Sequence, residues 1–159
     1  IKAAQTGHLV LSTLHTNSTC ETLVRLQQMG VARWMVSSAL SLVVAQRLVR
    51  KLCPHCRRET GSSTNVPHSL WPRSLPQWQA PGCQHCYHGY YGRLALFELL
   101  PVNTALRQAI TQGLSAEEIE TLARESGMMT LFESGCLAVE RGMTSLEEVV
   151  RVLGIPHGD

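Results

Sequence analysis

The sequence has few charged residues, few aromatic residues and no long apolar run. Charged side chains make up 16% of the 159 residues, aromatic side chains make up 5%, and the lysines are Lys2 and Lys51. The longest mostly apolar stretch, residues 31–49, contains two arginines, three serines and a glutamine. It lacks the run of about 18 apolar residues expected of a membrane-spanning helix. The apolar content of 44% still suffices for a folded core.

The length predicts one ordinary domain, or one domain with a small appendage. The chain has a mass of 17.6 kDa and begins at Ile1 instead of methionine. Its first residues are typical of the interior of a folded protein. We therefore expect the chain to be the C-terminal part of a longer protein.

Charge is distributed unevenly along the chain. Residues 1–60 carry eight Lys or Arg against two Glu, a net charge of +6, whereas residues 101–159 carry four Arg against eight Glu and one Asp, a net charge of −5. The basic first part favours an anionic partner, namely a nucleotide phosphate, a nucleic acid or the acidic face of a neighbouring subunit. The alternative is a scattered, solvated surface.

Two Cys-x-x-Cys pairs indicate a metal site. Cys53 and Cys56 are followed, after twenty-six intervening residues, by Cys83 and Cys86. Two such turns that face each other supply four sulfur ligands at about 2.3 Å in a tetrahedron, which suits a closed, structural zinc site. Two disulfides are the alternative, although the rest of the sequence does not resemble a small secreted scaffold.

Other metal-binding or redox side chains are interpreted differently. We interpret His55, His85 and His88, which lie beside the two pairs, as surface residues, with replacement of one cysteine ligand as the alternative. A thioredoxin-like redox site needs one Cys-x-x-Cys pair, not two. The isolated Cys20 and Cys136 are expected in the core.

Residues 8–17 combine an apolar run with a polar cluster. The consecutive apolar residues Leu9, Val10 and Leu11 predict a short strand that is buried on both faces of a mostly parallel sheet. The polar residues that follow then fall at the end of the strand, where ligands of open α/β sheets bind. In the alternative interpretation, residues 17 and 18 only end the strand and cap the next helix, because Ser18 and Glu21 have capping-box spacing.

The next segment predicts two helices and an extended arm. The first helix spans residues 19–29 and ends at Gly30, and the second spans residues 32–45. Trp34 and Met35 are expected in the core. Residues 47–52 are expected to be extended and to lead into the first cysteine pair.

Four of the seven prolines lie between the cysteine pairs, so residues 60–82 are expected to form a loop with a short turn near Leu70. Trp71 and Trp78 are expected to pack against the cysteine turns. A strand is predicted over residues 94–100. Helices are then predicted to start at Asn103, Ser115, Thr130 and Thr144, to end near glycines, and to pack together as a small bundle.

Several motifs together resemble the ATPases of type II secretion and type IV pilus assembly, of the GspE/PilB kind, including HofB-like members. The first is the run Thr6-Gly7-His8 to Leu14-His15-Thr16-Asn17, which resembles the histidine box of that family. The others follow in the family's order over nearly the whole chain: Arg25-Leu26, Met29-Gly30, Ala45-Gln46-Arg47-Leu48, the two cysteine pairs, Gly92-Arg93, Phe97-Glu98-Leu99 and Thr144 to Glu148.

The resemblance implies an α/β fold, the C-terminal part of a RecA-like P-loop ATPase core with an inserted tetracysteine zinc module and a small helical C-terminal region. The implied boundaries are 1–52 for the core, 53–93 for the zinc module and 94–159 for the strand and helices. The implied protein uses ATP and Mg²⁺ and works as a cytoplasmic homo-hexamer at the inner membrane. Its partner is a membrane platform protein, and no nucleic acid or direct membrane span is expected.

The resemblance also implies the site residues. His8 and His15 are expected to face the nucleotide or the subunit junction, and Thr16 and Arg47 are expected to contribute to nucleotide binding. Independently of the resemblance, the basic excess of the first sixty residues makes Arg25, Arg47 or Arg50 a candidate for contact with the nucleotide or with an acidic surface of the adjacent subunit. Cys53, Cys56, Cys83 and Cys86 are the expected zinc ligands.

One part of the family pattern is missing. The 159 residues contain no Gly-x-x-x-x-Gly-Lys-Ser/Thr loop to hold phosphates, so this stretch alone is expected to be inactive. The rival hypothesis is a zinc-ribbon module that binds nucleic acid, although only Arg73 and Arg93 are basic between residues 61 and 100. A third possibility is an interaction scaffold whose helical tail docks a partner.

Overall fold

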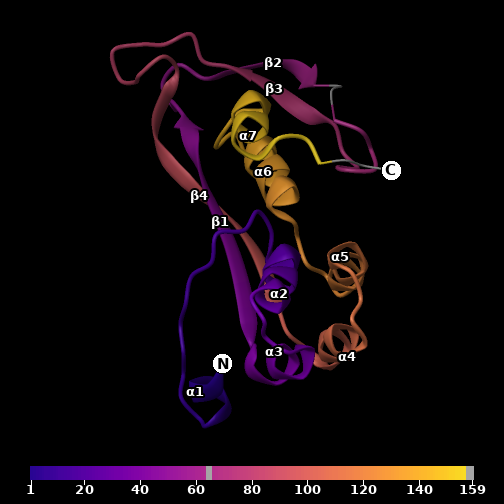
Figure 1. Cartoon of the computed structure of the whole chain (residues 1–159). Helices are drawn as coiled ribbons and strands as arrows, with labels where there is room; N and C mark the ends of the chain where they lie inside the picture. The colour runs from indigo at the N-terminus through magenta and orange to yellow at the C-terminus, as the bar shows by residue number, and fades with distance from the viewer. Residues whose placement is uncertain (64–65, 157–159) are drawn as a thin grey trace. The chain divides into compact units, whose positions relative to one another are not determined.

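The computed structural model describes residues 1–63 and 66–156, and Figure 1 labels its elements. Their bounds along the chain are α1 (Lys2–Gln5), α2 (Thr19–Gln28), α3 (Arg33–Ala39), β1 (Leu42–Leu52), β2 (Arg58–Ser63), β3 (Leu75–Gln79), β4 (Tyr90–Pro101), α4 (Thr104–Gln112), α5 (Ala116–Glu125), α6 (Leu131–Glu140) and α7 (Leu146–Leu153). Within the described residues, no helix is both long and apolar enough to cross a membrane.

The chain packs into two units that each use separate stretches of sequence. Unit 1 consists of Ile1–Ala45 and Glu98–Met129, and unit 2 consists of Gln46–Phe97 and Thr130–Asp159. Strands β1 and β4 run through both units, because each unit contains part of both strands. The domain boundaries predicted after residues 52 and 93 follow the sequence motifs and not this division into two units. They stay a prediction.

The core of unit 1 is helical. Helix α2 begins at Ser18, whose side chain accepts a hydrogen bond from the backbone N–H of Glu21, as the capping pattern predicted. Gly30 follows the helix with φ of +93°, which confirms the predicted stop. The apolar faces of α2, α3, α4 and α5 bury a cluster that includes Leu23, Val36, Leu106, Ile110 and Ile119.

The second predicted helix is too long. Helix α3 ends at Ala39, and residues 42–45, predicted to be helical, begin strand β1 instead. Side chains of β1 alternate between exposed and buried over residues 42–45, the period of a strand with one covered face. These residues are extended because β1 pairs with β4. The backbone N–H of Val102 donates to the carbonyl of Ser41, and the N–H of Cys53 donates to the carbonyl of Gly89, so the two strands are antiparallel.

The segment between the cysteine pairs contains more structure than predicted. Strands β2 and β3 form an antiparallel pair in which Arg58 faces Gln79 and Ser63 faces Leu75. The turn near Leu70 is confirmed, because its N–H donates to the carbonyl of Pro67. Residues 64 and 65 of the predicted loop lie outside the described residues.

Four helices form in the C-terminal region, two in each unit, and three of them have the predicted capping residue. Asn103, Ser115 and Thr130 cap α4, α5 and α6, and Thr130 and Glu133 form a full capping box. The cap of α7 is Ser145 and not Thr144, whose hydroxyl donates to the carbonyl of Arg50 instead. Helices α4 and α5 belong to unit 1, and α6 and α7 belong to unit 2.

The strand predicted at Leu9 to Leu11 is wrong for this structure. Residues 8–16 have no regular secondary structure, and the side chains of Leu9 and Leu11 are 91% and 88% exposed. A strand needs neighbouring strands to cover it, and the two sheets of the described residues pair only β1 with β4 and β2 with β3. Trp34 is exposed as well, contrary to the prediction.

Candidate functional site

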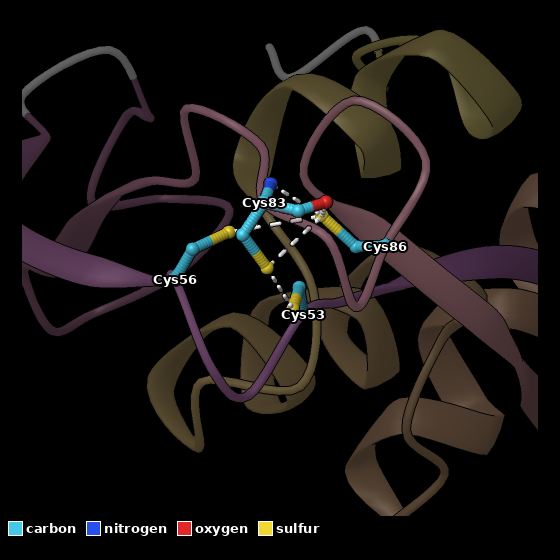
Figure 2. A group of neighbouring side chains, drawn as sticks. All are labelled: Cys53, Cys56, Cys83 and Cys86. Carbon is cyan, nitrogen blue, oxygen red and sulfur yellow. Dashed lines mark hydrogen bonds between the residues drawn. The ribbon is translucent and has the colours of Figure 1, made fainter.

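The two Cys-x-x-Cys turns come together in unit 2. The first turn follows β1, where the N–H of Arg57 donates to the carbonyl of Cys53, and the second precedes β4, where the N–H of Cys86 donates to the carbonyl of Cys83. Figure 2 shows the four side chains converging from these two turns. All four sulfur atoms lie within 4.8 Å of one another. The predicted cluster of Cys53, Cys56, Cys83 and Cys86 is therefore present.

The spacing of the sulfur atoms fits a tetrahedral zinc ion. The Sγ–Sγ distances are 3.7 Å between Cys53 and Cys83, 3.8 Å between Cys56 and Cys86, and 3.7 Å between Cys83 and Cys86. A tetrahedron with zinc–sulfur bonds of about 2.3 Å has edges of about 3.8 Å. The same distances are far longer than a disulfide bond of about 2.05 Å, so the alternative of two disulfides does not apply.

The electrostatics of the cluster also favour a bound cation. Burial raises the pKa of Cys53, but the backbone N–H groups of Cys56 and His55 lower it, and the result is about 7. For Cys83 the N–H of His85 lowers the pKa, whereas burial and the neighbouring thiols raise it to about 12. Thiols this close compete for ionisation because their negative charges repel each other. A divalent cation removes that conflict and suits four thiolates.

The second cysteine turn is fixed by a close backbone approach. Gly89 has φ of +96°, and a Cβ atom there would lie 2.3 Å from the carbonyl oxygen of Ala80. Its own carbonyl accepts the N–H of Cys53 at 2.8 Å, which links the two turns by the backbone. His85 and His88 are exposed, as predicted, and the cluster contains four cysteines and no histidine among the described residues.

The tryptophans hold β3 and the turn between β2 and β3 against α6. Trp78 also packs next to the first cysteine turn, as predicted, because the guanidinium of Arg57 lies 5.3 Å from its ring. The indole N–H of Trp78 donates to the carbonyl of Val139, and that of Trp71 donates to Glu140. Arg73 donates to the same carboxylate and lies 4.7 Å above the Trp71 ring. These contacts anchor the Pro-rich segment between the cysteine pairs to α6.

The residues predicted to face a nucleotide lie in both units. His8 and His15 are exposed in unit 1, and the Nδ1 atom of His8 lies 3.2 Å from the carbonyl oxygen of Ala3. Thr16, also in unit 1, shares a hydrogen bond of 2.7 Å with the hydroxyl of Thr22. Arg47 belongs to unit 2 and donates to the carbonyl of Gln46.

Two buried carboxylates were not predicted as structural centres. Glu98 lies in unit 1 and accepts hydrogen bonds from both the N–H and the hydroxyl of Thr19, at the start of α2. Glu148 lies in unit 2 and accepts hydrogen bonds from Arg50 and Arg151. The sequence did contain a signal for Glu98, namely an acidic residue within an otherwise apolar strand. A charge in such a place is buried and therefore requires hydrogen-bond partners.

The fold and the four-cysteine cluster define a class of protein: an α/β chain that carries a closed tetracysteine module. The family described as type II/IV secretion system protein matches residues 1–151, so the chain belongs to that family. The family match confirms the resemblance inferred from the histidine box, the cysteine pairs and the intervening motifs.

The chain is similar to several named proteins over nearly all of its length. It is 70% identical over 159 residues to the protein transport protein HofB homolog of Escherichia coli K12, covering 100% of this chain and 34% of that protein. It is 43% identical over 157 residues to the type IV pilus assembly ATPase PilB of Pseudomonas aeruginosa PAO1, and this match covers 96% of this chain and 28% of that protein. It is 42% identical over 160 residues to the type II secretion system protein E of Klebsiella pneumoniae, and this match covers 98% of this chain and 32% of that protein.

A solved structure supports the fold. The crystal structure of the pilus retraction motor PilT with bound ADP matches with a TM-score of 0.62 and 23% identity, over 94% of this chain and 34% of that one. The likeness supports an α/β fold of the same kind for this chain. The chain spans about a third of the length of the relatives it matches.

Proposed function

We propose that this chain is the C-terminal part of an ATP-hydrolysing motor that powers type II protein secretion or the assembly of a type IV pilus or pseudopilus. The observation that carries the proposal is the similarity, over nearly all of this chain, to proteins named for these roles, among them a pilus assembly ATPase at 43% identity. The motor uses ATP and Mg²⁺, and the phosphate-binding loop is supplied by residues other than these 159.

The cysteine cluster holds one structural zinc ion in this proposal. Cys53, Cys56, Cys83 and Cys86 provide four sulfur ligands and leave no open coordination position, so the ion stabilises the module and does not take part in the reaction. Zinc binding in such sites contributes on the order of 10–16 kcal/mol to folding. Elemental analysis of the protein in reducing buffer should give one zinc per chain, and a value well below one would contradict this assignment.

The histidine box senses the nucleotide in the same proposal. His8 and His15 face the nucleotide or the subunit junction, and Thr16 and Arg47 contribute to nucleotide binding. The support is the resemblance of residues 6–17 to the family's histidine box, together with the exposure of both imidazoles. An exposed imidazole is free to donate to a phosphate oxygen or to relay the nucleotide state to a neighbouring subunit.

The working form is a cytoplasmic homo-hexamer that acts on a platform protein at the inner membrane. Arg25 and Arg47, which belong to the basic first sixty residues, are candidates for contact with a neighbouring subunit. Sedimentation of the full-length protein with nucleotide should show a hexamer. Charge reversal at both arginines should weaken assembly, and unaltered assembly of that double variant would contradict the role of these arginines.

The rival function is nucleic-acid binding, and one experiment distinguishes it from the proposed motor function. Binding through phosphate contacts falls steeply with salt, because bound counterions are released. A filter-binding assay with single-stranded and duplex DNA at two salt concentrations should show no specific retention of the purified protein. Tight binding with a steep salt dependence would favour a nucleic-acid-binding module over a motor.

A further inference from the structure

The four cysteines of the cluster differ in their exposure to solvent. Cys53 is fully buried, Cys56 and Cys86 are half-buried, and Cys83 is exposed. A zinc-bound cysteine is a thiolate and remains nucleophilic, and the access of a reagent to it depends on exposure. By the accessibility of the whole residue, Cys83 is therefore the member of the cluster that solution reaches most easily.

The sulfur atom of Cys83 has a second sulfur atom beside it in the same turn. The Sγ atoms of Cys83 and Cys86 are 3.7 Å apart, and the N–H of Cys83 donates to the sulfur of Cys86. Cys53 is equally close to Cys83, but it is buried and its backbone is held by the carbonyl of Gly89. A disulfide within the second turn requires only a local shift of the two sulfurs, from 3.7 Å to about 2 Å.

We propose that Cys83 is an oxidative modification site at which a hydroperoxide opens the metal cluster. The thiolate of Cys83 attacks one oxygen of hydrogen peroxide, the O–O bond breaks, hydroxide leaves, and Cys83 becomes a sulfenic acid. The thiolate of Cys86 then attacks the sulfur of Cys83, forms the disulfide and expels a second hydroxide. The two sulfurs together lose two electrons, which reduce the peroxide to the equivalent of two water molecules.

Loss of these two ligands releases the zinc ion. Only Cys53 and Cys56 remain as thiolates, so the site no longer offers the four ligands of a closed zinc centre. The second turn, which leads into β4, then loses its metal link to the first turn. A dithiol reductant and added zinc restore the cluster, because the disulfide is the only covalent change. This inference rests on the proposed zinc site and deepens it, since it names how the site is regulated.

Two buried cysteines serve as internal references. Cys20 in unit 1 and Cys136 in unit 2 are 2% and 0% exposed. Burial raises the pKa of each thiol to about 12, so both remain protonated and unreactive at neutral pH. Their modification during an experiment would report unfolding and not the chemistry of the cluster.

The test is peroxide titration of the zinc-loaded, full-length protein, with zinc release followed by a chromogenic chelator and cysteines mapped by peptide mass spectrometry. We expect the Cys83–Cys86 disulfide to form first, with one zinc released for each disulfide, and Cys20 and Cys136 to stay unmodified. First formation of a bond between Cys53 and Cys83, or zinc loss without a disulfide, would overturn the inference. If the protein carries no zinc, the zinc assignment fails, and the mapping still decides whether Cys83 oxidises first.

A matched pair of variants provides a second test. Cys83→His and Cys56→His each leave three cysteines and one histidine, a ligand set that also binds zinc. Peroxide should release zinc from the Cys83→His protein more slowly, by about fivefold or more, because the thiolate of Cys83 is absent. Release from the Cys56→His protein should be faster than from the Cys83→His protein and should still yield the Cys83–Cys86 disulfide. Equal release rates from both variants would count against Cys83.

Discussion

Glu148 is a buried carboxylate that ties α7 to the strand β1 within unit 2. It is 1% exposed, and its oxygen atoms accept hydrogen bonds from the backbone N–H of Arg50, at 2.7 Å, and from the side chains of Arg50 and Arg151. Burial raises the pKa of this carboxyl group, but the two arginines outweigh that effect and lower it from 4.5 to about 2. The carboxylate is therefore more stable in the folded than in the unfolded chain.

We expect acid to remove the stabilisation that Glu148 provides. A lowered pKa contributes stability that is complete above about 4.5 and is lost as the pH falls towards about 2, because the unfolded chain binds the proton first. The lowering of the pKa from 4.5 to about 2 corresponds to a contribution of roughly 3 kcal/mol at neutral pH. Glu148→Gln should lower the free energy of unfolding, measured by urea denaturation of the full-length protein, at pH 7 but much less at pH 3.

The neighbouring residue supplies the control for this measurement. Glu147 is exposed on the same helix, so Glu147→Gln should leave the free energy of unfolding nearly unchanged at either pH. An equal loss for both variants, or a loss for Glu148→Gln that does not depend on pH, would show that the buried ion pair does not stabilise the module.

The histidine box provides a second prediction at the scale of single residues. His8→Ala and His15→Ala in the full-length protein should each lower ATP turnover while leaving its melting temperature nearly unchanged, because both side chains are exposed. His68, which is exposed in unit 2, is the control, and His68→Ala should retain normal turnover. Normal turnover in both histidine-box variants would remove the proposed sensing role.

Single residues also show where prediction from sequence succeeds. The four ligand cysteines were predictable because their chemistry and spacing are local, and one short turn brings each pair together. The ion pair of Glu148 was not predictable, because its partner Arg50 in β1 lies 98 residues away along the chain and comes close only in the folded protein. The cap of α7 was misplaced by one residue because Thr144 and Ser145 are both suitable caps, and the contact of Thr144 with Arg50 decided between them.

The turn before β4 is the element on which the metal site depends most closely. Gly89→Ala should destabilise the cysteine module strongly, since the new Cβ would meet the carbonyl of Ala80 at 2.3 Å in addition to the strain of φ at +96°. We expect the purified variant to contain much less than one zinc per chain by elemental analysis.

Gly30 is a matched control for this substitution. It has nearly the same φ, +93°, but a Cβ there meets nothing within 4 Å. Gly30→Ala should therefore cost only the backbone strain, about 1–2 kcal/mol, and should retain its zinc. Full zinc content in the Gly89 variant would show that the close approach to Ala80 does not shape the site.

Elements were predictable where the signal was local. Helix starts with capping residues and helix stops at glycine were found correctly, because a cap depends on three or four adjacent residues. The start of β1 and the pair β2–β3 were missed because a strand depends on a partner far along the chain. The apolar run at Leu9 to Leu11 was wrongly predicted as a strand for the same reason. Its pattern forms a strand only where other strands cover it, and Leu9 and Leu11 are exposed in this structure.

At the scale of the whole molecule, the chain spans about a third of the length of the relatives it matches. The +6 of residues 1–60 and the −5 of residues 101–159 suit contacts with other surfaces of a larger assembly. Family membership was predictable from motifs in sequence order. The division into two units was not, because each unit joins two separate stretches of chain.

Magnesium-dependent ATP hydrolysis tests the central claim most directly, measured side by side on the full-length protein and on the 159-residue chain. Phosphoryl transfer needs a phosphate-binding loop with its lysine, and neither Lys2 nor Lys51 follows a glycine-rich loop. The account predicts turnover by the full-length protein and none by the shorter chain, even when that chain contains zinc. An inactive full-length protein, or robust hydrolysis by the 159 residues alone, would contradict it.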